Sequence, residues 1–276
     1  MKILSGKELA KQETEKLKEL VKKIDPDDKP VLSIVQVGDN PASTKYVNAK
    51  LRKCEEIGIK GILHKFPETI SQNSLLKKLD VINESSTGVI IQLPLPDHIP
   101  QQVILDAVPT IKDVDGLSSR NEFILYNDIE ENHFVPATAR AVLELMEYYN
   151  IDVKDKKVCV VGRSHVVGKP LAHIIKRMGA DVATYNENTG VKGVETGDIV
   201  IVAIGVAEYI KEQNIKEGAI VIDVGTNLDA KLTEKLVGDV DAESVSKKAS
   251  ALSPVPGGVG PMTVVCLLKN LLDIYR

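Results

Sequence analysis

The chain has 276 residues, of which 43% are hydrophobic and 27% are charged, and its formal net charge is −4. These shares are typical of a globular protein with one or two domains, and the slightly acidic balance gives no reason to expect nucleic acid or an anionic membrane as a partner. We expect no secretory signal peptide, no membrane-spanning helix and no metal site, because apolar stretches are short and the five histidines lack metal-ligand spacing.

Helix and strand patterns alternate through the first half of the chain. The predicted segments are helix 6–24, strand 30–37, helix 43–57, strand 61–66, helix 71–83 and strand 88–93. Alternation of this kind predicts βαβ units and a mainly parallel sheet. The polar segment 112–138 is expected to be irregular.

The second half repeats the alternation and is typical of a mononucleotide-binding unit. Its predicted segments are helix 138–149, strand 157–161, helix 167–178, strands 181–185, 199–203 and 219–224, and a last helix after Pro261. Ligands of such units are expected at the carboxyl ends of the strands. Cys54, Cys159 and Cys266 are far apart in apolar or helical surroundings, and we expect buried, reduced thiols.

Residues 254–263 read Pro-Val-Pro-Gly-Gly-Val-Gly-Pro-Met-Thr, and this is the most informative stretch of the sequence. Proline fixes φ and glycine has no Cβ, so the loop is rigid and its backbone can approach a ligand closely. A loop that leads into a helix in this way suits a flat or anionic ligand. A stiff connector between domains is the alternative interpretation.

This stretch resembles a signature of the FolD-type methylenetetrahydrofolate dehydrogenase/cyclohydrolases, and the resemblance extends over nearly the whole chain. Further matching blocks occur in the expected order: Val37-Gly38-Asp39-Asn40-Pro41-Ala42-Ser43 with Tyr46 and Lys50, Gln92-Leu93-Pro94-Leu95-Pro96, Lys112-Asp113-Val114-Asp115-Gly116, Val161-Gly162-Arg163-Ser164, Ile222-Asp223-Val224-Gly225 and Gly238-Asp239-Val240.

The resemblance implies that Tyr46, Lys50, Gln92 and Asp115 are catalytic and that Tyr46, Lys50 and Asp115 also bind the folate. Tyr46 and Lys50 are one helical turn apart, so they share a helix face. A lysine beside the cationic methenyl carbon has a lowered pKa and can activate water, and Gln92 can hydrogen-bond it. One carboxylate can accept two parallel pterin N–H donors, a role the resemblance gives to Asp115, whereas Asp113 is expected to organise the loop. Without the resemblance, a solvated lysine and surface turn aspartates would be the simpler interpretation.

The same resemblance supports coenzyme binding by Gly162, Arg163 and Ser164. Gly205 and Thr226 follow two later strands and are expected to line the nicotinamide pocket, with ordinary strand-end turns as the alternative. The segment 162–168 follows a strand and opens a helix, a context suited to a phosphate, although the spacing is not G-x-G-x-x-G. A tight turn with a surface arginine is the alternative. The remaining substrate-binding assignments lie in the glycine–proline loop: Gly258, Pro261 and Thr263.

Two departures from the family pattern affect these expectations. Pro136-Ala137-Thr138-Ala139 replaces the usual Pro-Cys-Thr-Pro, which is expected to loosen the start of the helix that follows. A glutamate, Glu187, stands where a serine commonly contacts the 2′-phosphate of NADP. Arg163 favours NADP and Glu187 favours NAD; we expect NADP, with NAD as the alternative, because the exposed glutamate can turn into water.

The expected fold is α/β, with two doubly wound α/β domains, a cleft between them and a Rossmann-like C-terminal domain. Residues 1–138, completed by the helix 257–276, would form the folate-binding catalytic domain, and residues 139–256 the dinucleotide-binding domain. The implied function is NADP-dependent oxidation of 5,10-methylenetetrahydrofolate followed by hydrolysis to 10-formyltetrahydrofolate, by a cytoplasmic homodimer of one-carbon metabolism. The alternatives are a monofunctional NAD-dependent dehydrogenase and a non-catalytic folate or dinucleotide sensor.

Overall fold

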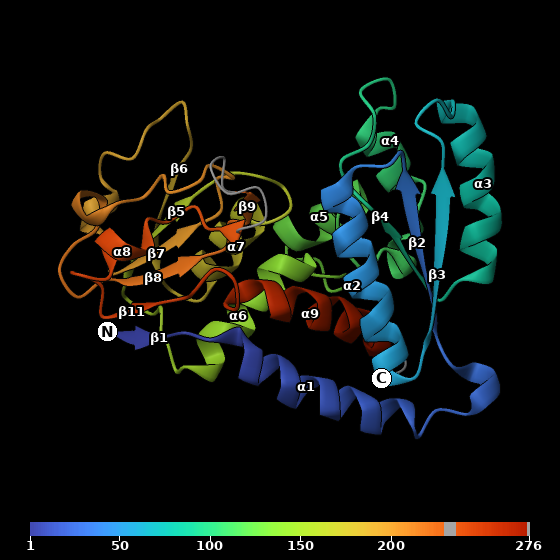
Figure 1. Ribbon diagram of the computed structural model, residues 1–276, viewed down its shortest axis with the longest axis horizontal. Helices are drawn as coiled ribbons and strands as arrows, with labels where there is room; N and C mark the ends of the chain where they lie inside the picture. The colour runs from blue at the N-terminus through green and yellow to red at the C-terminus, as the bar shows by residue number, and fades with distance from the viewer. Residues whose placement is uncertain (229–235, 275–276) are drawn as a thin grey trace. The chain divides into compact units, whose positions relative to one another are not determined.

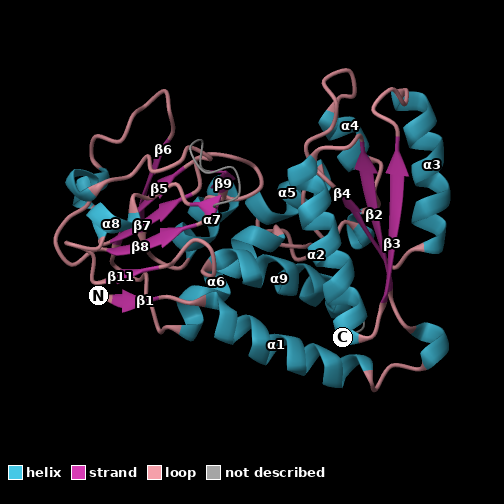
Figure 2. Cartoon of the chain, viewed as in Figure 1, coloured by secondary structure: helices cyan, strands magenta, loops and turns pink. Residues whose placement is uncertain are grey.

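The computed structural model describes residues 1–228 and 236–274, and its contacts divide the chain into two compact units. Gln12–Ala137 and Val264–Arg276 form the three-strand unit, and Met1–Lys11 and Thr138–Thr263 form the six-strand unit. Each unit contains a parallel sheet accompanied by helices (Figures 1 and 2). The predicted two-domain α/β class is therefore confirmed.

The sheet of the three-strand unit has the order β3-β2-β4, and its neighbouring strands are parallel. Its elements are η1 (Pro26–Asp28), β2 (Val31–Val37), α2 (Pro41–Ile57), β3 (Lys60–Phe66), α3 (Gln72–Ser85), β4 (Gly88–Ile91), α4 (Gln101–Asp106), η2 (Thr110–Lys112) and α5 (Ser119–Tyr126). Helices α2 and α3 cover opposite faces of this sheet (Figure 1). The central strand β2 is accordingly buried from Leu32 to Val37, as its apolar sequence predicts.

The sheet of the six-strand unit has the order β1-β11-β8-β7-β5-β6 and is parallel throughout. Its elements are β1 (Lys2–Ile3), β5 (Lys157–Val161), α7 (Gly168–Arg177), β6 (Asp181–Tyr185), η3 (Val194–Thr196), β7 (Ile199–Val202), η4 (Glu212–Asn214), β8 (Ile220–Asp223), α8 (Ala242–Val245) and β11 (Ala251–Leu252), together with the antiparallel pair β9 (Asn227–Leu228) and β10 (Leu236–Val237). A buried cluster that includes Val161, Val200 and Val221 forms its core. Burial of each such side chain stabilises the fold by about 1.5–3 kcal/mol.

Three helices contain the residues at which the two units divide: α1 (Gly6–Val21), α6 (Ala137–Tyr148) and α9 (Val259–Asp273). The first eleven residues cluster with the six-strand unit rather than with residues 12–137, because β1 pairs with β11. A two-residue strand is too short to show a periodic pattern, so the sequence could not indicate that residues 1–11 pair with the six-stranded sheet.

Several elements differ from the sequence-based expectation. Segment 112–138 is not irregular throughout, because α5 begins after Ser118, whose side chain accepts a hydrogen bond from the backbone N–H of Asn121. The last helix begins at Val259, before Pro261, because proline is tolerated in a first helical turn. Helix α6 begins at Ala137, and Ala137 and Ala139 are both buried, so the altered motif still opens a helix; a looser helix start stays a prediction.

The three cysteines are buried, as expected, and burial raises the pKa of the Cys54 thiol to about 12. Within residues 1–228 and 236–274, the helices are too short or too polar to cross a membrane.

Candidate active site

Helix α2 positions Tyr46 and Lys50. Its first turn is fixed by the side chain of Asn40, which accepts a hydrogen bond from the backbone N–H of Ser43 at 3.0 Å. The Ser43 hydroxyl donates to the carbonyl of Leu93 at 3.2 Å, which ties the start of α2 to the segment after β4. This segment also contains Gln92, so the hydrogen bond of Ser43 connects the helix that carries Lys50 to the segment that carries Gln92.

Lys50 and Gln92 form a buried hydrogen bond. Lys50 is 8% exposed, and its Nζ donates to Oε1 of Gln92 at 3.0 Å. The amide nitrogen of Gln92 donates to the carbonyl of Leu93 at 2.8 Å. Because that nitrogen is already engaged, the amide turns its oxygen toward Lys50. The expected contact between the two residues is therefore present.

Asp115 lies close enough to Lys50 for the two charges to affect each other. Burial lowers the pKa of Lys50, and the negative charge of Asp115 partly opposes this effect. Burial also raises the pKa of Asp115, while Lys50 lowers it and Asp113 raises it further. Both groups are thus biased toward their neutral forms, a condition suited to proton transfer.

The loop that carries Asp115 is fixed by Asp113. This side chain is 4% exposed, and its carboxylate accepts hydrogen bonds from the backbone N–H of Gly116 at 3.1 Å and of Ser118 at 2.7 Å. It also accepts one from the amide of Asn121 at 2.8 Å. The prediction that Asp113 organises the loop is confirmed, and folate binding by Asp115 stays a prediction.

Two buried asparagines complete the support of this loop, and the sequence did not single them out. The amide oxygen of Asn121 accepts the backbone N–H of Phe134 at 3.0 Å. The amide nitrogen of Asn270, from α9, donates to the carbonyls of Val114 at 2.8 Å and Val135 at 3.1 Å. An asparagine in an otherwise apolar helix, as at position 270, is the signal that could have indicated this role.

Tyr46 is the exposed member of the predicted folate set. Its side chain is 43% exposed, in contrast to Lys50 one turn later on the same helix. An exposed aromatic ring beside a buried amine can provide a face for a flat ligand. This role of Tyr46 stays a prediction.

In the six-strand unit, the turn after β5 is shaped by two close glycines. Gly162 has φ of +121°, and a Cβ there would lie 2.1 Å from the carbonyl oxygen of Ala203. A Cβ on Gly168 would lie 2.0 Å from the carbonyl oxygen of Gly162. Side chains are therefore excluded at both positions, and helix α7 begins at Gly168 without a side-chain cap. The turn therefore lets a ligand approach the backbone closely at the N-terminus of a helix, a context that suits an anionic group such as a phosphate.

Arg163 and Ser164 follow this turn and are exposed. The guanidinium of Arg163 donates to the hydroxyl of Thr184 at 3.0 Å and to its carbonyl at 2.6 Å, which holds the side chain against the end of β6. Glu187 lies exposed in the next turn, which is closed by hydrogen bonds between Asn186 and Thr189. Arg163, which is predicted to favour NADP, and Glu187, which is predicted to favour NAD, thus follow the neighbouring strands β5 and β6.

The other predicted coenzyme residues follow β7 and β8. Gly205 lies in the loop after β7, and its backbone N–H donates to the carboxylate of Asp239 at 2.8 Å. Thr226 is exposed in the segment after β8. Asp239 was noted in the sequence only as part of a matching block, without a role.

The glycine–proline loop forms the start of α9. The backbone N–H of Gly258 donates to the carbonyl of Pro254 at 2.7 Å, and Pro261 and Thr263 lie in the first turns of the helix. The structure therefore accounts for the rigidity of this loop by its own hydrogen bonding, and its contact with a ligand stays a prediction.

Comparisons with known proteins agree along the whole chain. Residues 4–115 match the tetrahydrofolate dehydrogenase/cyclohydrolase catalytic domain, and residues 136–276 match the tetrahydrofolate dehydrogenase/cyclohydrolase NAD(P)-binding domain. Bifunctional protein FolD of Mycoplasmopsis synoviae is 59% identical over 278 aligned positions and is covered, like this chain, over 100% of its length.

Solved structures give the same result. The methylenetetrahydrofolate dehydrogenase/cyclohydrolase FolD of Campylobacter jejuni superposes with a TM-score of 0.94 at 40% identity, over 99% of this chain and 98% of that one. The Trypanosoma brucei enzyme, solved with NADP cofactor and an inhibitor, has a TM-score of 0.92 at 33% identity, over 99% and 96% of the two chains.

Proposed function

The chain belongs to the tetrahydrofolate dehydrogenase/cyclohydrolase family, and we propose that Lys50, Gln92 and Asp115 carry the hydrolytic half of its activity. The protein is a bifunctional enzyme. It oxidises 5,10-methylenetetrahydrofolate to the methenyl compound with NADP and hydrolyses that product to 10-formyltetrahydrofolate. The 3.0 Å hydrogen bond between buried Lys50 and Gln92 carries the assignment of the hydrolytic residues.

In the hydrolytic step, Lys50 takes a proton from the water that attacks the bridging carbon. The lowered pKa of Lys50 supports this role, since only the neutral amine can accept a proton. The cationic substrate lowers the pKa further. Gln92 accepts a hydrogen bond from the amine in either protonation state, and so aims it without supplying a second charge.

Asp115 holds the folate by accepting the pterin ring N–H and the exocyclic amine together. Asp113 fixes the loop that carries Asp115, which supports this geometry. Tyr46 contributes an aromatic face to the same substrate. Gly258, Pro261 and Thr263 are assigned to folate by the family pattern.

For the oxidation, the coenzyme supplies the hydride acceptor, and the protein supplies position. Gly162, Ser164 and the start of α7 would hold phosphate groups, because the turn excludes side chains at its glycines and leads into the N-terminus of a helix. Arg163 would contact the 2′-phosphate of NADP, and Gly205 and Thr226 would lie along the nicotinamide end. We favour NADP over NAD because Glu187 is exposed and can turn away.

An absorbance assay with methylenetetrahydrofolate and each coenzyme tests the function as a whole. We expect the methenyl product to appear and then to decay faster than it does without enzyme. Accumulation of methenyl product that decays only at the uncatalysed rate would contradict the hydrolytic assignment.

The family pattern also supports a cytoplasmic homodimer. Light scattering coupled to size-exclusion chromatography tests the assembly, with a mass near twice that of the chain as the expected result and the mass of one chain as the contradicting one.

A further inference from the structure

Two buried aspartates lie at the carboxyl end of the six-stranded sheet, and the reaction described above uses neither. Asp223 ends β8 and is 3% exposed, and Asp239 follows β10 and is 0% exposed. Carboxylates buried to this extent are rare unless they are fully hydrogen-bonded. Their partners therefore indicate what they are for.

Asp239 connects the loop after β7 to the segment after β8. One carboxylate oxygen accepts the backbone N–H of Ile204 at 2.7 Å and of Gly205 at 2.8 Å. The other oxygen accepts the side-chain amide of Asn227 at 2.8 Å. Both connected segments include residues assigned to the coenzyme.

Asp223 in turn fixes Asp239. Its carboxylate accepts the backbone N–H of Asp239 and of Val240, each at 3.0 Å, and that of Gly225 at 3.0 Å. Burial, together with the charge of Asp239, raises the pKa of Asp223 to about 7. The backbone of Asp239 thus has little freedom to move relative to β8.

The two aspartates also explain a pair of glycines. A Cβ on Gly225 would lie 2.1 Å from the carboxyl carbon of Asp239, and a Cβ on Gly238 would lie 1.7 Å from a carboxylate oxygen of Asp223. The sequence blocks Asp223-Val224-Gly225 and Gly238-Asp239-Val240 therefore interlock, because each glycine makes room for the carboxylate of the other block. Such close packing leaves a single arrangement for both segments.

We propose that Asp239 is a positioning residue for the coenzyme. It holds the backbone at Ile204 and Gly205 at a set distance from Asn227, so that the two loops that contact the nicotinamide end are already ordered before the coenzyme binds. The inference rests on the proposed function, because it requires the coenzyme to lie along the loops after β7 and β8. Ordering these loops in advance lowers the entropy that binding must overcome.

The two sides of the Asp239 carboxylate differ in a way that permits a specific test. Ile204 and Gly205 offer backbone N–H groups, which can only donate, whereas the amide of Asn227 can turn to offer its oxygen. In the double variant Asp239→Asn with Asn227→Asp, the oxygen of the new asparagine can face the two backbone donors. Its amide nitrogen can then donate to the new aspartate.

The experiment compares Asp239→Ala, Asn227→Asp and this double variant by fluorescence titration with NADPH and by steady-state kinetics. We expect Asp239→Ala to weaken coenzyme binding by about tenfold or more, as loss of acceptors for buried donors implies. Hydrolysis of separately supplied methenyltetrahydrofolate should stay within about twofold, because its residues lie on other elements. Asn227→Asp alone places two carboxylates face to face and should weaken binding, and the double variant should restore most of it.

Asp241→Ala is the matched control. Asp241 lies two residues further along and caps α8 by accepting the N–H of Ser244 at 3.1 Å, so its loss should lower stability and leave coenzyme affinity unchanged. Wild-type NADPH affinity in folded Asp239→Ala, or a double variant no better than Asn227→Asp, would overturn the inference. If Asp239→Ala does not fold, the comparison of the other two variants decides. Failure of the proposed function would show instead as wild-type enzyme that oxidises no methylenetetrahydrofolate with either coenzyme.

Discussion

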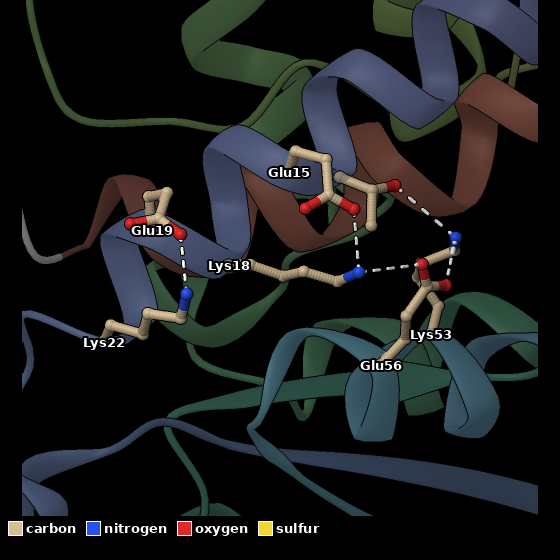
Figure 3. Close-up of polar contacts among 7 residues, drawn as sticks. Glu15, Lys18, Glu19, Lys22, Lys53 and Glu56 are labelled. Atoms are coloured by element: carbon tan, nitrogen blue, oxygen red, sulfur yellow. Dashed lines mark hydrogen bonds and ion pairs between the residues drawn. The ribbon is translucent and has the colours of Figure 1, made fainter.

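Lys50 and Lys53 lie three residues apart on α2 and have opposite surroundings. Lys50 is 8% exposed and hydrogen-bonds the neutral amide of Gln92, whereas the side chain of Lys53 is 25% exposed and pairs with Glu56 at 2.6 Å. Figure 3 shows this second environment: Glu56 is shared with Lys18 of α1, and Lys18 also pairs with Glu15.

The difference lies in how each charge is balanced. Lys53 is partly exposed to water and pairs with the carboxylate of Glu56, so its charged form is stable there. Around Lys50, the nearest hydrogen-bond partner is neutral and burial lowers the pKa of the amine. Two lysines less than one helical turn apart thus have different charge environments, and only the buried one has the lowered pKa that is typical of functional sites.

Lys50→Met should have the largest effect. Loss of the proton acceptor is expected to reduce methenyl hydrolysis by about 10²- to 10⁴-fold. The measurement is the decay of methenyl absorbance, with circular dichroism to verify folding. Lys53→Met is the matched control, since it removes the same charge from the same helix. A folded Lys50→Met enzyme that hydrolyses at the wild-type rate would refute the distinction between the two lysines.

Asp115→Ala should weaken folate binding and leave coenzyme binding near wild type. Two pterin donors would lose their shared acceptor in a partly desolvated site, at a cost of about 1–3 kcal/mol. Separate titrations with a folate and with NADPH measure the two effects. Asp113→Ala serves as the comparison, because it removes support for the loop and should also lower Tm. Equal weakening of both ligands by Asp115→Ala would mean that this residue acts through the fold.

Arg163→Ala should lower the ratio of kcat/KM for NADP to kcat/KM for NAD by about tenfold or more, which corresponds to the loss of a charge-assisted hydrogen bond to phosphate. We expect kcat/KM to fall for NADP and to change little for NAD. The ratio of the two values in wild type and variant is the measurement. Preference for NAD in the wild type, with a ratio unaffected by the substitution, would make Glu187 the determinant.

The pH dependence of hydrolysis should reveal the lowered pKa of Lys50. A base acts when neutral, so the rate should rise with pH through a midpoint below the ordinary lysine value of 10.5. The charge of Asp115 raises the pKa of Lys50, so Asp115→Asn should move the midpoint to lower pH. Rate profiles at saturating folate measure both midpoints. An unmoved or upward-shifted midpoint in the variant would contradict the coupling of the two groups.

Lys53→Met should have the smallest effect. Partly exposed ion pairs contribute less than about 1 kcal/mol, so the free energy of unfolding should change little. That change should shrink further at high salt, because ions screen the charges that surround Lys53. Urea titrations at low and high salt, together with both enzyme assays, give the result. Loss of either activity in a folded Lys53→Met enzyme would show that Lys53 also contributes to the reaction.

The sequence by itself determined the long regular elements and the class of the protein. Strands such as Lys157–Val161 and Asp181–Tyr185 were predicted at their observed limits, because apolar β-branched runs between turns have few alternative structures. The ordered blocks around Lys50, Gln92 and Asp115 indicated the family, since each block keeps its spacing along the chain.

Only the tertiary structure decided which distant groups meet. The pairing of β1 with β11 joins residues about 250 positions apart, and neither two-residue strand carries a period of its own. Asn270 reaches Val114 across 156 positions, and Asp239 reaches Ile204 across 35. Local propensity contains no information about such contacts, because they form only when elements distant in the sequence pack against one another. The residues that we propose act at the site were thus visible in the sequence, and most of those that support them were not.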